Sequence, residues 1–164
     1  MNTQTLITNI LKDIRVELTD EFDRNFERKG FFNDPWPDTK HLNNRGSLMM
    51  RSGDLRRGLE SDIDSGIAVR WTNSVPYATI HNEGGTIDIT AKQRAYFWYR
   101  HKKGKDESED DEAEMWKHMA LAKQLKIPKR QFIGDHPKVS KIVEECISTN
   151  MDDFLKQFDA EIRR

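Results

Sequence analysis

The stretch of sequence that decides the fold is VPYATIHNEGGTIDI, residues 75–89. Pro76 fixes its own φ and disfavours a helical conformation in the residue before it, so a new element begins at this point. Tyr77 and the isoleucine three residues later stand at helical spacing, which predicts a short helix. Gly84 and Gly85 then supply a left-handed stop that a side chain would resist. The last four residues alternate between polar and apolar, so the chain leaves this turn as a strand.

Two long amphipathic helices are predicted near the ends of the chain. Residues 4–29 carry apolar side chains at steps of three and four, and Gly30 stands where a helix stop is expected. Residues 137–162 repeat this pattern, with a proline at the favoured first position. Cys146 falls on the apolar stripe of the second helix, where a small buried side chain fits.

Strand patterns lie between these helices. Residues 58–72 alternate apolar and polar side chains on both sides of an Asp-Ser-Gly turn, which predicts an antiparallel hairpin. Together with residues 86–90 and 129–133, this hairpin is expected to form one small, mainly antiparallel sheet covered by the two long helices. The expected fold class is therefore α+β. Four apolar residues beside the glycine pair are expected to share one core cluster: Trp71, Tyr77, Ile80 and Phe132.

Residues 91–126 differ in composition from the rest and are interpreted as an insertion into a single domain that spans residues 1–164. Aromatic and basic residues interleave first, and then seven acidic residues occur among the nine positions from Asp106 to Glu114. We expect two helices joined by this acidic loop. We also expect the loop to be disordered in the isolated subunit, because it offers too little apolar surface to offset its ordering entropy.

Composition excludes several classes of function. The chain has 164 residues, is 35% hydrophobic and 34% charged, and carries a formal net charge of −1, so no global field favours nucleic acid or an acidic membrane. No apolar run approaches the ~20 residues that span a bilayer, and the first residues lack the pattern of a signal peptide. The lone Cys146 excludes an intrachain disulfide and a cysteine-based zinc site. A reducing cytoplasm is the expected compartment.

No catalytic constellation emerges from the sequence. His81 and Glu83 are two residues apart, so on a helix they point about 200° apart and do not converge on one ligand. The other histidines are scattered, and no nucleophile elbow, P-loop or dinucleotide motif occurs. We therefore expect no enzyme activity, no metal and no cofactor. We expect a structural role for His81, namely a hydrogen bond to the backbone at the end of its helix.

The aromatic-basic run of residues 96–105 supports a second hypothesis, that of an accessory protein that binds nucleic acid. Bases of a single strand stack on aromatic rings while cations contact the phosphates. The acidic block that follows immediately would repel a polyanion, so nucleic acid is the less favoured partner.

Three short motifs occur in a fixed order along the chain: SGxL from Ser52, YAxIHxxGG from Tyr77 and IPxRxFIG from Ile127. Their order, with the hairpin between the first two and a long helix after the last, resembles the phage virion morphogenesis family. This family includes tail completion proteins of contractile-tailed phages and prophages. The resemblance covers about residues 5–90 and 127–160, whereas residues 31–51 and the insertion depart from it.

The resemblance implies a structural protein rather than an enzyme. The implied role is to form a ring, for which a hexamer is one candidate size, that caps the tail tube and supports head–tail joining. The implied partners are further copies of the chain, tail-tube proteins and head–tail connector proteins. The implied location is the host bacterial cytoplasm during assembly and then the tail or neck of the virion. The motif residues are expected to be structural: Tyr77, His81, Gly84, Gly85, Arg130, Phe132 and Gly134.

A ring of this kind needs head-to-tail contacts with a rotation that closes. The candidate interface residues combine exposed aromatic and basic character: Trp36, Trp98, Tyr99, Arg100, Lys102 and Lys103. We expect the basic residues 92–105 of one subunit to face the acidic residues 106–114 of the next. Because exposed ion pairs contribute only ~0–1 kcal/mol each, they would set register and salt sensitivity rather than affinity.

Overall fold

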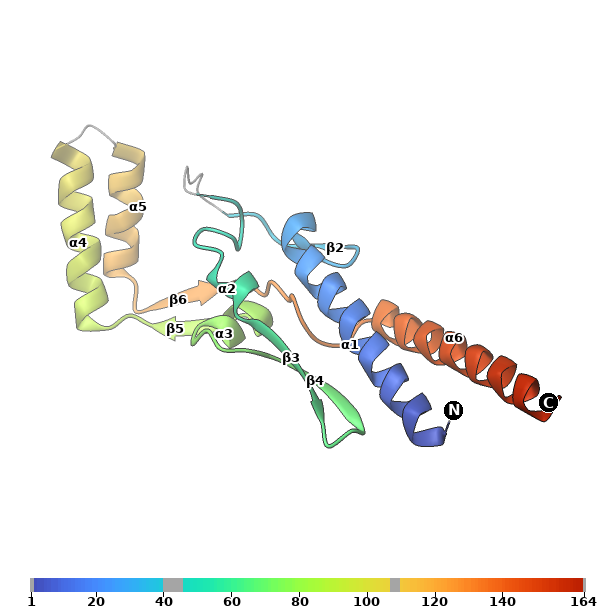
Figure 1. Cartoon of the computed structure of the whole chain (residues 1–164). Coiled ribbons are helices and arrows are strands. Elements are labelled where there is room, and N and C mark those ends of the chain that lie inside the picture. Colours follow the sequence, from blue (N-terminus) through green and yellow to red (C-terminus); the bar gives the residue numbers. More distant parts are fainter. Residues whose placement is uncertain (1, 40–45, 107–109, 164) are drawn as a thin grey trace.

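The computed structural model describes residues 2–39, 46–106 and 110–163 and has an α+β architecture, as expected (Figure 1). Its elements are α1 (Thr3–Arg28), β1 (Gly30–Phe31), β2 (Asp34–Pro35), α2 (Asp54–Arg57), β3 (Leu59–Asp64), β4 (Ala68–Asn73), α3 (Ala78–Glu83), β5 (Gly85–Asp88), α4 (Ala91–Asp106), α5 (Asp110–Leu121), β6 (Gln124–Ile127) and α6 (Pro137–Ile162). The two long helices, α1 and α6, pack side by side at one end of an elongated molecule. The α4–α5 hairpin lies at the other end.

The strands form three two-stranded antiparallel sheets instead of the single sheet expected. The predicted hairpin is confirmed as β3–β4, in which Ile63 lies opposite Val69. The fourth predicted strand is wrong, because β6 lies at 124–127 rather than 129–133 and pairs with β5. Pro128 follows immediately and has no N–H group to continue the ladder.

The long helices start at capping side chains. Asn2 accepts a hydrogen bond from the backbone N–H of Thr5 at 2.8 Å to open α1, and His136 Nδ1 accepts from Lys138 at 3.1 Å to open α6. The left-handed residue that ends α1 is Lys29, with φ of 55°, rather than the expected Gly30. Gly30 instead begins β1, where a Cβ atom would stand 2.7 Å from the carbonyl oxygen of Asp34. This close approach is what requires glycine at that position.

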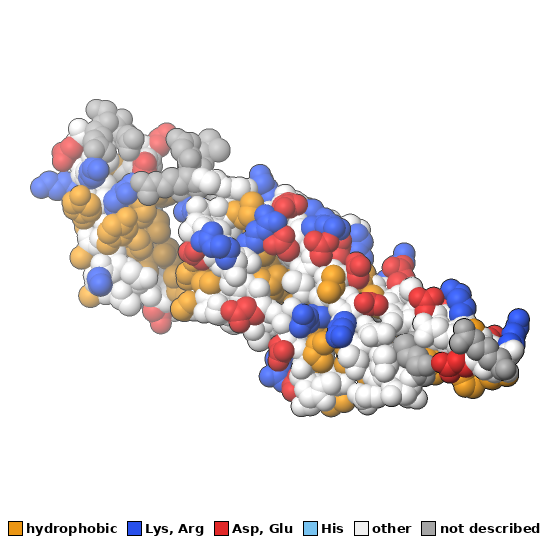
Figure 2. All heavy atoms as spheres, viewed as in Figure 1, with side chains coloured by type: hydrophobic (Ala, Val, Ile, Leu, Met, Phe, Trp, Pro, Cys, Tyr) orange, Lys and Arg blue, Asp and Glu red, His pale blue; other side chains and the backbone are white. Residues whose placement is uncertain are grey.

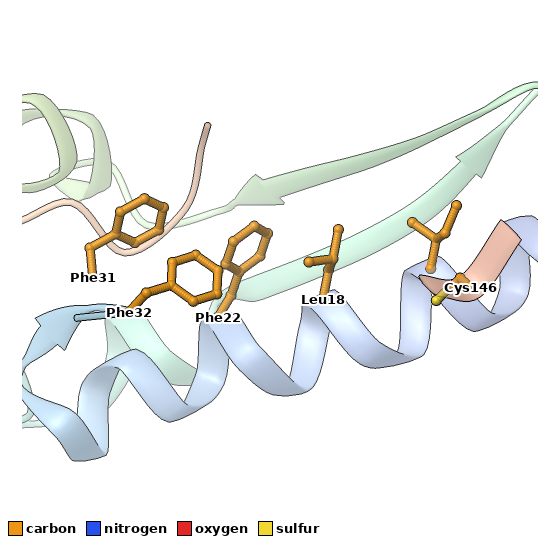
Figure 3. Packing of buried hydrophobic residues seen from close by; sticks show 6 residues of the cluster. Leu18, Phe22, Phe31, Phe32 and Cys146 are labelled. Atoms are coloured by element: carbon orange, nitrogen blue, oxygen red, sulfur yellow. The ribbon is translucent and has the colours of Figure 1, made fainter. Parts of the chain in front are cut away.

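The first core cluster joins α1 to α6 (Figure 3). Leu18, Phe22 and Cys146 lie in it together with Phe31 from the short β1 strand. Trp71 from β4 meets Phe22 edge to face at 5.6 Å, and its ring N–H donates to Thr19 Oγ1 at 2.9 Å. The placement of Cys146 on a buried stripe is confirmed.

The second core cluster contains Phe26, Trp36, Leu55, Ala78 and Phe132. Burial of Phe132 is confirmed, but the expected single cluster is wrong because Trp71 belongs to the first cluster. Tyr77 is 43% exposed, and its neighbour Ala78 occupies the core position. The reason is a turn at Pro76, in which Ala78 N–H donates to the carbonyl of Val75 at 2.9 Å, so that α3 begins one residue later. Ile80 is half-buried beside Gly85.

We call residues 85–127 the arm and the remaining described residues the body. The arm consists of the β5–β6 ladder and the α4–α5 hairpin and contains the predicted insertion. Its own small cluster is built on Ile89, Phe97 and Ala120, with Trp116 packed against them. Figure 1 shows the arm projecting away from α1 and α6.

The acidic loop of the arm is shorter than expected. Asp106 closes α4 and residues 110–114 open α5, so the prediction of disorder is wrong for these residues, while residues 107–109 lie outside the described part of the chain. Two contacts account for the added order. Glu112 forms an ion pair with Arg100 at 2.7 Å, and Ala113 packs directly on Gly104.

Candidate functional site

The YAxIHxxGG and IPxRxFIG motifs meet in the body at the end of α3. Gly84 has φ of 73°, and a Cβ atom there would stand 2.7 Å from the backbone nitrogen of Lys129. Glycine is therefore required both by the backbone conformation and by the close approach of the second motif. Gly85 and Gly134 also have positive φ, at 149° and 129°. The structure thus brings together two motifs that are separated by the whole arm.

Hydrogen bonds from outside any β-ladder hold the segment 128–134. The backbone N–H of Arg130 donates to the carbonyl of His81 at 2.8 Å. The side-chain oxygen of Asn82 accepts from the N–H groups of Phe132 at 2.9 Å and Ile133 at 3.2 Å. Asn82 thus replaces the strand partner that this segment lacks.

Asn25 of α1 completes the same junction from the opposite side. Its amide donates to the carbonyl of Phe132 at 3.1 Å and accepts from the N–H of Phe32 at 2.8 Å, and its side chain is fully buried. Sequence reasoning missed both asparagines. The available signal for Asn25 was a polar residue next to Phe26 on the apolar stripe of a helix, which is costly unless the amide is fully bonded.

Arg130 links the IPxRxFIG motif to the loop that follows β2 through side-chain hydrogen bonds. It is 7% exposed, its Nε donates to the carbonyl of Pro37 at 3.0 Å, and its Nη2 donates to the carbonyl of Asp38 at 3.3 Å. Burial lowers the pKa of the guanidinium, the charge of Arg51 lowers it further, and the Asp38 carboxylate opposes them. The structural role expected of Arg130 has a geometric basis in these bonds.

His81 contributes to the junction through its backbone rather than its ring. Its carbonyl accepts from Arg130, whereas Nδ1 is buried with no hydrogen-bond partner among the described residues. Burial lowers the pKa of the ring, and the charge of Arg130 lowers it further, so the imidazole is neutral near pH 7. Tyr77 packs against this ring edge to face at 5.8 Å.

A cleft of about 360 Å³ opens beside the junction. The residues that line it are mainly apolar, hydroxyl-bearing and basic: Thr39, Gly46, Ser47, Leu48, Met49, Arg51, Ser52, Leu55, Tyr77, His81 and Arg130. Among the described residues of the lining, no carboxylate and no cysteine could pair with His81 as acid, base or nucleophile. In the described part of the chain, no three His, Cys, Asp or Glu residues are grouped to hold a metal ion. The arrangement supports a structural role for the motifs.

The candidate interface residues divide into two groups. Trp36 is buried inside the subunit, where its ring N–H donates to the carbonyl of Gln131 at 2.6 Å, so its expected place in an interface is wrong. Arg100 turns inward, because its guanidinium pairs with Glu112 and lies over the Trp116 ring at 5.0 Å. The remaining four residues, Trp98, Tyr99, Lys102 and Lys103, are exposed on α4.

Figure 2 shows that hydrophobic side chains gather on the surface at the arm end of the molecule, with basic side chains near them. On α4, Trp98 and Tyr99 are 40% and 62% exposed. Lys102 and Lys103 follow these two aromatic residues by four positions, so all four share one helical face. We call this surface, together with Lys92, the outer face of α4.

The fold and the site define an α+β protein in which two motifs hold the backbone together and α4 exposes aromatic and basic side chains. The chain belongs to the phage virion morphogenesis family, whose model matches residues 2–152. This match confirms the resemblance of its motifs and assigns it a structural role in building the phage particle. Searches of curated proteins and of solved structures found no match. Among the described helices, none is both long and apolar enough to cross a membrane.

Proposed function

We propose that the protein completes the phage tail by capping the tail tube as a ring of identical subunits and thereby supports head–tail joining. The observation that carries this proposal is the family match over residues 2–152. The proposed partners are other copies of the chain, the tail-tube proteins and the head–tail connector proteins. The proposed location is the host cytoplasm during assembly and the tail or neck of the finished virion.

The surface of the subunit supports association rather than turnover of a substrate. Large apolar side chains are exposed at both ends of the molecule, on α4 and along α6. A monomer that stayed alone would leave these side chains in water, and exposed apolar surface of this kind marks sites of protein contact. In a ring with head-to-tail contacts, each subunit buries such surfaces against its two neighbours.

Deletion of the gene in the phage or prophage that encodes it tests this proposal. Electron microscopy of the lysate should show separate heads together with unjoined or overlong tails. Expression of the intact chain from a plasmid should restore joined virions, which controls for effects on neighbouring genes. Normal joined virions after the deletion would contradict the proposal.

Nucleic-acid binding by residues 96–105 is the second candidate. It is supported by the exposed rings of Trp98 and Tyr99 and by the lysines beside them. It is weakened because Tyr96 and Phe97 pack against Trp116 within the arm, at 5.9 and 5.8 Å between ring centroids. A gel-shift assay with single-stranded DNA and RNA at low salt tests it, and a stable complex would favour this alternative.

A further inference from the structure

The second half of α6 carries an apolar stripe that the subunit does not cover. Its members are spaced three and four apart and are 39–68% exposed: Ile147, Met151, Leu155, Phe158 and Ile162. The earlier turns of α6 differ, because Val139 and Val143 pack against the first core cluster. The stripe is large enough to act as a contact surface, and it continues to the last turn of the helix.

Acidic side chains border this stripe. Residues 144–162 contain six acidic residues and one lysine, a formal charge of −5. Asp152 precedes Leu155 by three positions and Asp159 follows it by four, so both lie beside the stripe on the helix surface. The one lysine of this stretch, Lys156, pairs with Asp153 at 3.1 Å, and in the described part of the subunit neither Asp152 nor Asp159 has a basic side chain within 4 Å. We call the stripe and its acidic border the distal face of α6.

The outer face of α4 has the opposite charge and carries two exposed aromatic rings, Trp98 and Tyr99. Residues 91–106 contain six basic residues and one acidic residue, a formal charge of +5. Lys92 precedes Tyr99 by seven positions and Lys102 follows Trp98 by four, so both lysines lie beside the exposed rings. Each face therefore combines an apolar strip with charges that complement those of the other.

These two faces lie at opposite ends of the molecule, as Figure 1 shows, so they cannot meet within one subunit. We infer that the outer face of α4 in one subunit binds the distal face of α6 in the next. This inference rests on the proposed ring and names its contact. Because the two faces differ, the contact is heterologous. A pair of subunits therefore leaves one copy of each face for the next neighbours, and in a closed ring every copy is occupied.

The inference replaces the expected contact between residues 92–105 and the acidic residues 106–114 of a neighbour. Within the arm, Arg100 already pairs with Glu112, and Glu114 pairs with Lys117 at 3.0 Å. These carboxylates are therefore partly neutralised inside the subunit. In the acidic border of α6, Asp153 pairs with Lys156 at 3.1 Å, whereas Asp152 and Asp159 form no ion pair among the described residues and are the carboxylates offered to a neighbour.

Charge reversal of the full-length chain tests the contact in solution. One variant reverses α4 (Lys92→Glu with Lys102→Glu), and the other reverses α6 (Asp152→Lys with Asp159→Lys). Sedimentation velocity over a concentration series at low salt should show that each reversal weakens self-association at least about tenfold, because like charges then face each other. An equimolar mixture of the two variants should restore association, since both kinds of contact become attractive again.

The matched control for the α4 reversal is Lys12→Glu with Lys129→Glu, which makes the same change in charge at exposed positions outside both faces. This control should associate like the unmodified chain. Circular dichroism of all variants checks that the helices remain. A chain that stays monomeric at every concentration, or oligomers that respond equally to the control and to the reversals, would overturn the inference.

Cysteine cross-linking identifies the two faces directly. In a Cys146→Ala background, Trp98→Cys and Leu155→Cys variants are mixed and oxidised, and we expect disulfide-linked dimers that contain one copy of each. The control is Ile67→Cys at the tip of β3–β4, which is 80% exposed but lies on neither face. Dimers made mainly of two Trp98→Cys chains would show a head-to-head contact and overturn the inference.

The same reversals separate this inference from the proposed function. In the phage that lacks the gene, each single reversal should fail to restore joined virions, and a chain that carries both reversals should succeed. If deletion has no effect on virions, the proposed function is wrong. If deletion has its expected effect but each single reversal complements fully, tail completion stands and this contact is wrong.

Discussion

In the body, side chains from the two ends of the chain meet, whereas the cluster of the arm is drawn from one continuous segment. Phe26 and Phe132 lie 5.2 Å apart between ring centroids although more than one hundred positions separate them. In the arm, Phe97 stacks on Trp116, and the whole cluster is drawn from residues 89–125. The comparison indicates that contacts within its own segment stabilise the arm, so we expect the arm to open separately from the body.

Phe132→Ala should have the largest effect on stability, and it should act on the whole molecule. Its ring is fully buried and contacts the core of the body, so truncation should lower the free energy of unfolding by about 3–5 kcal/mol. Urea denaturation followed by circular dichroism measures this. A loss well under 1 kcal/mol would mean that the junction is not central to the body.

Phe97→Ala should act on the arm alone. Removal of this ring, which is 7% exposed, should cost about 3 kcal/mol of local stability. Hydrogen exchange in α4 and α5 should then accelerate about a hundredfold while α1 and α6 keep their protection. Equal acceleration in both regions would show that arm and body unfold as one unit.

Gly84→Ala tests the joint between the two regions. The substitution strains a backbone with φ of 73° and drives a Cβ atom into the backbone of Lys129, so we expect a loss of about 3 kcal/mol. Gly66→Ala is the matched control, because its φ is 69° but nothing lies within 4 Å of the added atom, and it should cost only about 1 kcal/mol. Similar losses for both glycines would remove the close approach as an explanation.

The smallest expected effect is a pH dependence from His81. Burial holds the pKa of His81 in the folded protein below the ordinary value of 6.5, so the unfolded chain takes up a proton at higher pH than the folded chain does. The free energy of unfolding should therefore decrease as pH falls below about 6.5. Urea titrations at pH 7.5 and 5.5 should show a smaller decrease in His81→Phe than in the unmodified chain, and His118→Gln on the exposed surface of α5 serves as control.

The parts of the fold that follow from local spacing were predictable from sequence. The helix expected at 137–162 is α6, Pro137–Ile162, and the hairpin expected at 58–72 is β3–β4. The spacing of apolar residues and the identity of the turn residues determine such elements, and both are properties of residues close together in the sequence. The motif order was also sufficient to indicate the family.

The errors arose where tertiary contacts override local pattern. The apolar residues of 129–133 resemble a strand, but Asn82 and Asn25 bond this backbone in place of a neighbouring strand. Trp36 lies in a segment without helical or strand periodicity, so the sequence predicts an exposed loop residue. In the structure its ring packs against Phe26 and donates a hydrogen bond to the carbonyl of Gln131 in the core. No local signal in the sequence specifies partners that lie about one hundred residues away.

The bond between Asn25 and the Phe132 carbonyl also bears on the order of folding during synthesis. It joins residues separated by 107 positions, and the bond from Trp36 to Gln131 spans 95. The second core cluster therefore cannot close until residue 132 has left the ribosome, long after α1 has been made. The arm contains mainly local contacts, which form quickly, so it can fold first. We therefore expect the arm of the nascent chain to be folded while α1 still lacks its tertiary contacts. The full set of contacts of α1 forms only after α6 has been synthesised.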